Sequence, residues 1–420
     1  MRPSCSAPRS GFERRSRRPA CIPAFLLASL ALAGCGGGAG ERARGDFTIE
    51  SLSSGTERIT YRRLPDHELG LDTLAVWDLY AGQDYLFHKI WDAAGIPGGF
   101  VLLDGGNRQL VLVDRQGRFR AAAGRQGGGP GEFQYPADVE TSGEEIWVAD
   151  LLNSRYSVFT TGGAYLREVG WKEIALWGGS FAPLDDGRLL YQGEEAADLT
   201  DEEEVPTHYY LIRREPATGR ADTLASMEAE PNRQIELRSS GGQAMRFVGP
   251  PQFAARMHWS AGPPGSGTVW VVTCGDYRVR QLDLEGQTIR EIVMPVPDLR
   301  VTAQTRQRYF EANPPTFGFG SGETYEVTRQ SLGEYPFAEV RAAVRGVRVD
   351  PVGRLWVQVS TEDLNADRLD VFTPGGRYLG SLRGVPLPMA FAPDGSALLR
   401  DSTDDSMDQF SVVALTGIDG

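Results

Sequence analysis

Apolar and polar positions alternate in short runs along this chain, most clearly in residues 124–159. This segment opens with glycines and a proline at 127–131, where neither a helix nor a strand is expected. Three runs with a period of two residues follow, separated by turn residues: Ala137 and Val139, Ile146 and Val148, Tyr156 and Val158. A period of two is typical of strands that bury one face. The segment therefore predicts a β-meander.

The same pattern recurs along the chain. Strands that end in a turn glycine and continue with an aromatic or apolar residue occur at 110–119, 156–166, 211–224, 279–289 and 369–379. The strand before three of these hairpins carries a tryptophan at the same place, and we expect these tryptophans to pack between sheets: Trp147, Trp270 and Trp356. A sixth copy begins near residue 394 and supplies only two strands. Such repetition is typical of a β-propeller.

The short sixth copy predicts how the propeller closes. A ring of radial sheets avoids an open edge when an N-terminal strand completes the last sheet. We therefore predict an all-β fold, a six-bladed β-propeller of four-stranded antiparallel blades closed by an N-terminal strand, over residues 46–420. The candidate closing strands are 47–51 and 58–63.

Insertions interrupt the later repeats. An acidic loop is expected at 194–204, and a polar connection between the third and fourth blades at 228–248. The longest insertion lies near 296–338. Within it, residues 302–312 predict a helix, because the following Asn-Pro-Pro would end one.

The N-terminus predicts export. Six arginines lie within residues 1–18, and an uncharged apolar run at 21–33 is too short for a permanent membrane span. The run ends in Leu32, Ala33, Gly34 and Cys35, which resembles the bacterial lipobox, whose cysteine is acylated. We expect a lipoprotein signal peptide at 1–34 and a flexible tether at 35–45, although an ordinary secretory signal is an alternative.

Charge and cysteine content narrow the expected partners. The formal net charge is −13, and it becomes more negative without the arginine-rich signal, so nucleic acid is not an expected partner. Once the signal is removed, Cys35 and Cys274 are the cysteines left, and a large apolar core must stabilise the fold without a disulfide between structural cysteines. We expect a monomer held at a membrane by acylated Cys35. Gly36 lacks the aspartate associated with inner-membrane retention, which favours the outer membrane of the bacterial cell envelope.

Residues 124–139 (GRQGGGPGEFQYPADV), followed by IWVADLLNSRYSVF, resemble an NHL repeat. The whole chain resembles the six-bladed β-propeller lipoproteins of Bacteria that carry this repeat. The resemblance implies a propeller fold and, in most members, a binding or scaffold role. We therefore expect an envelope protein that recognises a protein, peptide or glycan at the channel face, without catalysis.

An alternative is a metal-assisted hydrolase or lyase, because the chain is also similar in fold to lactonase-type and amidating-lyase propellers. Zinc requires clustered ligands, and four histidines in the whole chain disfavour it. Calcium prefers oxygen ligands, and such groups follow the second strand of several repeats, among them Asp104, Asp150 and Asp276. Asp and Asn at strand ends more often cap turns. We expect no cofactor, and calcium stays the alternative.

Candidate ligand-binding residues lie on loops that enter the innermost strands or join the second and third strands. These loops share one end of a propeller, where ligands usually bind. The candidates are Arg125, Gln126, Asn153, Arg155, Trp177, Arg256 and His258. No residue is assigned as catalytic or as a metal ligand, since the nucleophile-elbow and phosphate-loop motifs do not occur in the region that follows the signal.

Overall fold

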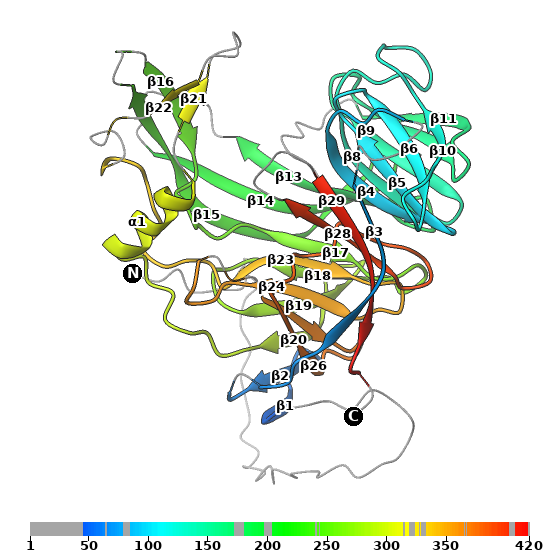
Figure 1. Cartoon of the computed structure of the whole chain (residues 1–420). Helices are drawn as coiled ribbons and strands as arrows, with labels where there is room; N and C mark the ends of the chain where they lie inside the picture. The colour runs from blue at the N-terminus through cyan, green and yellow to red at the C-terminus, as the bar shows by residue number, and fades with distance from the viewer. Residues whose placement is uncertain are drawn as a thin grey trace, which may run out of the picture.

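A computed structural model describes residues 45–63, 65–78, 85–171, 180–196, 204–239, 242, 244–313, 316–318, 324–326, 328, 333–364, 366, 368–402 and 408–418. Within these residues the chain is nearly all β-structure (Figure 1). The predicted signal peptide, Cys35 and all but the last residue of the predicted tether lie outside them. No helix among the described residues is both long enough and apolar enough to cross a membrane.

The first two sheets each contain four antiparallel strands in chain order. The first consists of β4 (Ile90–Ile96), β5 (Gly99–Asp104), β6 (Gln109–Asp114) and β7 (Phe119–Ala123). The second consists of β8 (Pro136–Ser142), β9 (Glu145–Asp150), β10 (Arg155–Thr160) and β11 (Tyr165–Gly170). The meander predicted from the alternating positions is therefore confirmed.

The fourth and fifth sheets repeat this order. They consist of β17 (His258–Ala261), β18 (Thr268–Val272), β19 (Arg278–Asp283) and β20 (Thr288–Val293), and of β23 (Val344–Val349), β24 (Leu355–Val359), β25 (Arg368–Phe372) and β26 (Tyr378–Arg383). The three repeated tryptophans, on β9, β18 and β24, are at most 5% exposed, as their repeated position predicted.

The third sheet has a fifth strand, which corrects one expectation. It contains β12 (Phe181–Pro183), β13 (Leu189–Ala196), β14 (Glu204–Arg214), β15 (Ala221–Arg238) and β16 (Ala244–Gly249). Residues 228–248 were expected to connect two blades. They instead prolong β15 and pair it with β16, from Arg238 opposite Ala244 to Arg233 opposite Gly249. A polar composition is compatible with a two-stranded edge as well as with a loop. Composition alone therefore could not distinguish the two structures.

An N-terminal strand completes the last sheet, as predicted, but it is neither of the two candidates. The last sheet runs β27 (Ala390–Phe391), β28 (Ala397–Ser402), β29 (Asp408–Thr416) and β3 (Gly70–Asp78). Trp77 of β3 is 7% exposed and stacks on Phe410 of β29, with ring centroids 4.8 Å apart.

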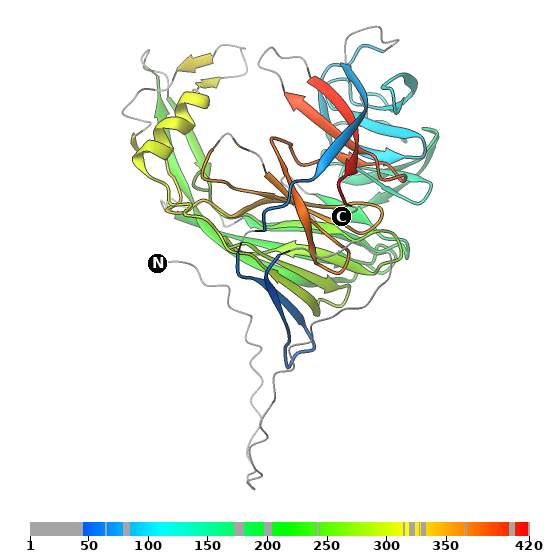
Figure 2. The same cartoon turned by 60° about the horizontal axis from the view of Figure 1, so that its bottom comes forward.

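The two strands proposed from the sequence extend the fourth sheet instead. β1 (Phe47–Ser51) pairs with β2 (Glu57–Tyr61), and β2 pairs in parallel with β20 (Figures 1 and 2). Ile59 and Tyr61 are buried in the core between the fourth and fifth sheets, and Arg58 Nε donates to Glu291 Oε2 at 2.5 Å. These buried side chains and the ion pair hold the hairpin at this edge rather than on the last sheet.

The sheets contact one another through their first strands. The backbone N–H of Val139 donates to Asp92 Oδ2 (3.0 Å), that of Phe181 to Asp138 Oδ2 (3.2 Å), and that of Val349 to Ser260 Oγ (3.0 Å). Each bond joins the first strand of one sheet to that of the next. Buried apolar clusters fill the spaces between successive sheets, including the space between the last and the first. This succession of packed antiparallel sheets is that of a β-propeller.

The predicted helix is confirmed as α1 (Ala303–Ala312). Thr302 is its N-cap and forms a capping box with Thr305, which satisfies backbone N–H groups that the first turn leaves free. Tyr309 packs edge-on against Phe253 and Phe337, at centroid distances of 5.4 and 5.7 Å. A two-stranded sheet of β21 (Thr316–Gly318) and β22 (Thr324–Glu326) follows the helix.

Candidate binding site in the central cavity

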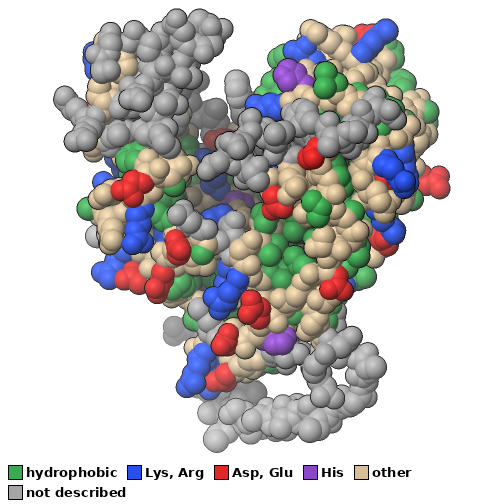
Figure 3. Space-filling model, viewed as in Figure 1, with side chains coloured by type: hydrophobic (Ala, Val, Ile, Leu, Met, Phe, Trp, Pro, Cys, Tyr) green, Lys and Arg blue, Asp and Glu red, His purple; other side chains and the backbone are tan. Residues whose placement is uncertain are grey.

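The first strands of the six larger sheets among the described residues surround a cavity of about 1020 Å³. Figure 3 shows Lys or Arg and His side chains inside a hollow at the centre of the molecule. The cavity extends to the turns that join the first and second strands, including Gly143, Asp185, Gly265 and Pro351. We had expected the ligand at the opposite end, where loops enter the first strands. The cavity also reaches that end, where Ser180, Met257 and His258 lie just before or at the start of their first strands.

Four charged side chains meet in the wall of this cavity or behind it. Asp92 lies on β4, Asp138 and Glu140 on β8, and Arg348 on β23. Arg348 Nη1 lies 3.5 Å from Glu140 Oε1, so the pair joins the second sheet to the fifth across the cavity. Arg348 also attracts both aspartates. One positively charged guanidinium group is therefore the shared counter-charge of three carboxyl groups.

Burial, with the neighbouring charge of Asp92, raises the pKa values of two of these carboxyl groups. Burial raises the pKa of Glu140 to about 7; Arg348 opposes the shift and Asp92 adds to it. Burial also raises the pKa of Asp138 well above its usual range, again with a contribution from Asp92. Near neutral pH, Glu140 can therefore both donate and accept a proton.

A second group lies on β17 and the segment before it. His258 lines the cavity and is half-buried. Burial lowers the pKa of His258 to about 4, and the positive charges of Arg256 and Arg345 act in the same direction. The imidazole is therefore neutral at neutral pH and can donate one hydrogen bond and accept another.

Trp259 gives the cavity an aromatic surface. It follows His258 on β17 and lines the cavity. Its indole Nε1 is buried and has no hydrogen-bond partner within the described part of the chain. A buried indole N–H usually has such a partner. The ring also packs against the buried apolar cluster between the third and fourth sheets.

The glycine-rich loop before β8 contains two of the candidates proposed from the sequence, and two more, at and near the start of β10, contact it. Arg125 and Gln126 are exposed, and Arg125 Nη2 lies 2.6 Å from Glu132 Oε1 in the same loop. Asn153 Nδ2 donates to Asp150 Oδ2 (2.6 Å) and to the carbonyl of Gly127 (3.1 Å). These contacts fix the shape of the loop.

Arg155 completes this arrangement. Its side chain is buried, and Nη2 donates to the carbonyl of Glu132 at 3.0 Å and to that of Gly129 at 2.5 Å, while Nη1 donates to Glu168 Oε2 at 2.7 Å. None of these four candidates lines the central cavity.

The three remaining candidates differ in where they lie relative to the cavity. His258 lines the cavity, and Arg256 is exposed but close enough to affect the His258 pKa. Trp177 lies outside the described residues. The sequence reasoning overlooked Asp138, Glu140, Arg348 and Trp259. A usable signal existed, because Asp138 and Glu140 are charged positions that alternate with apolar ones inside a predicted strand.

The oxygen ligands considered for calcium are turn caps where the structure shows their contacts. Asp104 and Asp150 are fully buried, and they accept hydrogen bonds from backbone N–H groups of Lys89 (3.2 Å) and Tyr135 (2.8 Å), respectively. Across the ranges that the structure describes, no three His, Cys, Asp or Glu residues are arranged to hold a metal ion.

No known family profile matches the chain, and no curated protein matches its sequence. Solved structures similar to it include a protein of Bacteroides fragilis described as exported (10% identity, 86% of this chain and 99% of that chain, TM-score 0.47). Regucalcin, a calcium-binding protein of Agrobacterium tumefaciens, is 13% identical (78% and 92% covered, TM-score 0.37). The PQQ-bound aldose sugar dehydrogenase of Streptomyces coelicolor is also 13% identical (84% and 100% covered, TM-score 0.39). Similarity at this level transfers no activity.

Proposed function

We propose that this protein is a closed, six-bladed β-propeller of the NHL-repeat type that binds a peptide segment or glycan in its central cavity. The pairing of β3 with β29 and the apolar cluster shared by the last and first sheets support ring closure. The proposal assigns binding to the cavity rather than to the glycine-rich loop.

The observation that carries the proposal is the combination of groups in one cavity wall. Trp259 offers an aromatic face, and the adjacent His258 is neutral at neutral pH. Aromatic faces and neutral hydrogen-bonding groups suit sugars and peptide segments, which have both apolar and polar faces. The cavity volume is at the upper end of the range of about 300–1,000 Å³ that ligand sites occupy.

The proposed place of action is the bacterial cell envelope. Export and acylation at Cys35 are supported by the lipobox-like Leu32, Ala33, Gly34 and Cys35, and Gly36 favours the outer membrane. We propose that the propeller is a monomer, with the membrane as a partner through the acyl chains.

The test uses the full-length protein extracted in detergent. It is screened against glycan and peptide arrays, and the affinity for the best hit is measured by calorimetry. Trp259→Ala should weaken binding about tenfold or more, because the aromatic contact with the ligand is lost. Tyr135→Ala is the control, since this exposed aromatic residue does not line the cavity. Equal affinities for Trp259→Ala and the wild type would rule out the proposed site.

A second candidate is a hydrolase or lyase that acts on the bound ligand, with or without calcium. It is favoured by the raised pKa values of Asp138 and Glu140, because perturbed carboxyl groups in a cavity are typical of acid–base catalysis. Incubation of the array hit with the protein, with product analysis by mass spectrometry, separates the two functions. Turnover that Glu140→Gln abolishes while affinity is kept would establish the enzyme.

A further inference from the structure

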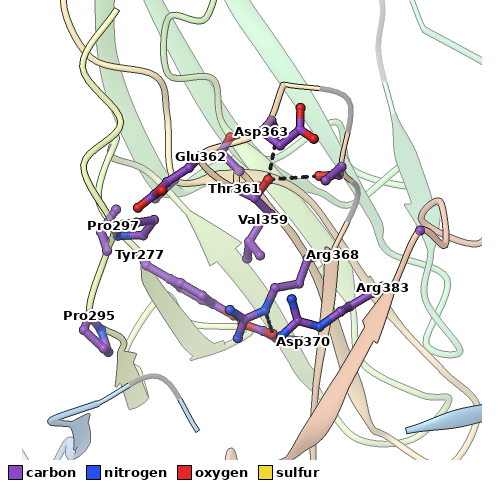
Figure 4. Close-up of a pocket in the computed structure, with 15 residues that line it drawn as sticks. Tyr277, Pro295, Pro297, Val359, Thr361, Glu362, Asp363, Arg368, Asp370 and Arg383 are labelled. Carbon is purple, nitrogen blue, oxygen red and sulfur yellow. Dashed lines mark hydrogen bonds and ion pairs between the residues drawn. The ribbon is translucent and has the colours of Figure 1, made fainter. Parts of the chain in front are cut away.

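A second cavity of about 400 Å³ lies between the fourth and fifth sheets (Figure 4). Pro295 and Pro297, after β20, form one wall, and Val359 and Thr361, at the end of β24, form another. This cavity lies where β24 ends and β25 begins, at the end of the propeller opposite the turns that the central cavity reaches. The two cavities share no lining residue.

Two arginines from neighbouring strands line this cavity. Arg368 at the start of β25 and Arg383 at the end of β26 are direct partners in the strand register. Figure 4 shows both guanidinium groups in the pocket, close to Asp370. Like charges directly opposite each other destabilise a sheet unless an anion lies nearby.

Asp370 balances only part of this charge. Asp370 is fully buried, and its Oδ1 accepts from Arg368 Nε and from Ser381 Oγ, both at 2.8 Å. Its Oδ2 accepts from Tyr277 Oη, also at 2.8 Å. Both carboxylate oxygens are thus occupied without Arg383.

The cavity therefore retains unused donors. Arg368 Nη2 is buried and has no hydrogen-bond partner among the described residues. Arg383 is exposed and lines the pocket, and its side chain forms no hydrogen bond or ion pair with any residue in the described ranges. A positive charge and an unsatisfied buried donor remain beside an apolar wall, and this combination favours an anionic ligand.

The other residues that line the pocket favour some anions over others. Guanidinium groups match the geometry of a carboxylate and bind it through paired hydrogen bonds. Pro295, Pro297 and Val359 would contact an apolar body, whereas Glu362 and Asp363 place negative charge on the pocket lining and disfavour a polyanion. We propose that this pocket binds a small monocarboxylic acid with an apolar body, its carboxylate held by Arg368 and Arg383.

Phenylacetate is the test ligand, titrated by calorimetry into the full-length protein in detergent. Saturable binding is expected, and Arg383→Gln should weaken it about tenfold or more, because a charge-assisted hydrogen bond is lost. Phenylacetamide, which has the same shape without the charge, should bind at least tenfold more weakly as well. Arg120→Gln is the matched control, since this exposed arginine lies on β7 in another sheet.

Arg383→Lys keeps the charge but loses the paired hydrogen-bonding geometry, so its affinity should fall between those of the wild type and Arg383→Gln. The assignment is overturned if phenylacetate and decanoate both fail to saturate the wild type at millimolar concentration, or if Arg383→Gln binds phenylacetate as the wild type does. It is also overturned if inorganic phosphate binds more tightly than phenylacetate. Trp259→Ala should leave phenylacetate binding unchanged, which keeps this test separate from that of the central cavity.

Discussion

Arg348 lies against three carboxyl groups, and its position explains how an acidic cavity can persist inside a folded protein. Its guanidinium approaches Glu140 to 3.5 Å and attracts Asp92 and Asp138. A single positive charge cannot offset all three negative charges, so a proton bound to Glu140 or Asp138 lowers the repulsion. The protonation state of the cavity therefore contributes to the stability of the propeller.

Glu140 should make the protein less stable as the pH rises. Its pKa in the folded protein is raised from 4.5 to about 7, so the folded state holds more protons than the unfolded state between these values. Stability falls with rising pH wherever the folded state binds more protons. Glu140→Gln should reduce this decline, which urea unfolding at about pH 5 and about pH 7.5 would measure. Asp138, whose pKa is also raised, accounts for the rest, so Glu140→Gln combined with Asp138→Asn should remove the decline.

His258 acts in the opposite direction and provides the control. Its pKa is lowered from 6.5 to about 4, so its contribution to stability is present above pH 6.5 and is lost as the pH falls through this window. When Glu140→Gln and Asp138→Asn are combined, the remaining dependence should therefore rise with pH, and a further change, His258→Gln, should flatten it. A decline with pH that persists in the combined variant would show that another group is responsible.

Individual strands were more predictable than their pairing. Period-two alternation, turn glycines and repeated tryptophans are local signals, and they correctly placed the meander, the hairpins and the capped helix. The partner of an N-terminal strand is not local. β1, β2 and β3 each carry apolar residues that can cover a sheet edge, and only packing with distant residues such as Ile292 or Phe410 decides which edge each covers.

Trp77→Ala should destabilise the protein by about 3–5 kcal/mol, because it removes a buried aromatic ring that stacks on Phe410. Urea unfolding monitored by circular dichroism gives the free energy. Phe47→Ala on β1 is the matched control and should cost less, since Phe47 is only half-buried. A larger loss for Phe47→Ala would mean that the β1–β2 hairpin, not β3, is the critical N-terminal element.

At the scale of the whole molecule, the site was less predictable than the fold. The glycine-rich loop was predicted to bind a ligand because its polar residues are adjacent in sequence. Its side chains instead mainly stabilise the shape of the loop. The cavity combines Glu140, His258 and Arg348 from three different sheets, with Asp92 of a fourth sheet behind its wall. No sequence spacing links them, because the ring brings together residues that are far apart along the chain.

The proposed anchor predicts the behaviour of a single variant. Cys35→Ser should leave the protein unprocessed or free in the soluble fraction, because acylation requires the cysteine thiol. Membrane fractionation and intact mass measurement check this outcome, with Cys274→Ser as the control cysteine. Membrane retention of Cys35→Ser at the mature acylated mass would contradict lipidation at this site.

The pairing of β3 with β29 also sets the order of events during folding. Gln409 faces Asp78, so β3 is synthesised early but meets its neighbour only after most of the chain has emerged. Contacts of such long range form slowly, and until then β3 presents an unpaired strand edge. Two apolar side chains of β3, Leu74 and Val76, are 52% and 53% exposed even in the folded protein. They give this strand an apolar surface to which other chains can bind. The nascent chain is therefore vulnerable to aggregation until β29 has been synthesised. A chaperone that covers residues 70–78 during this interval would reduce the aggregation.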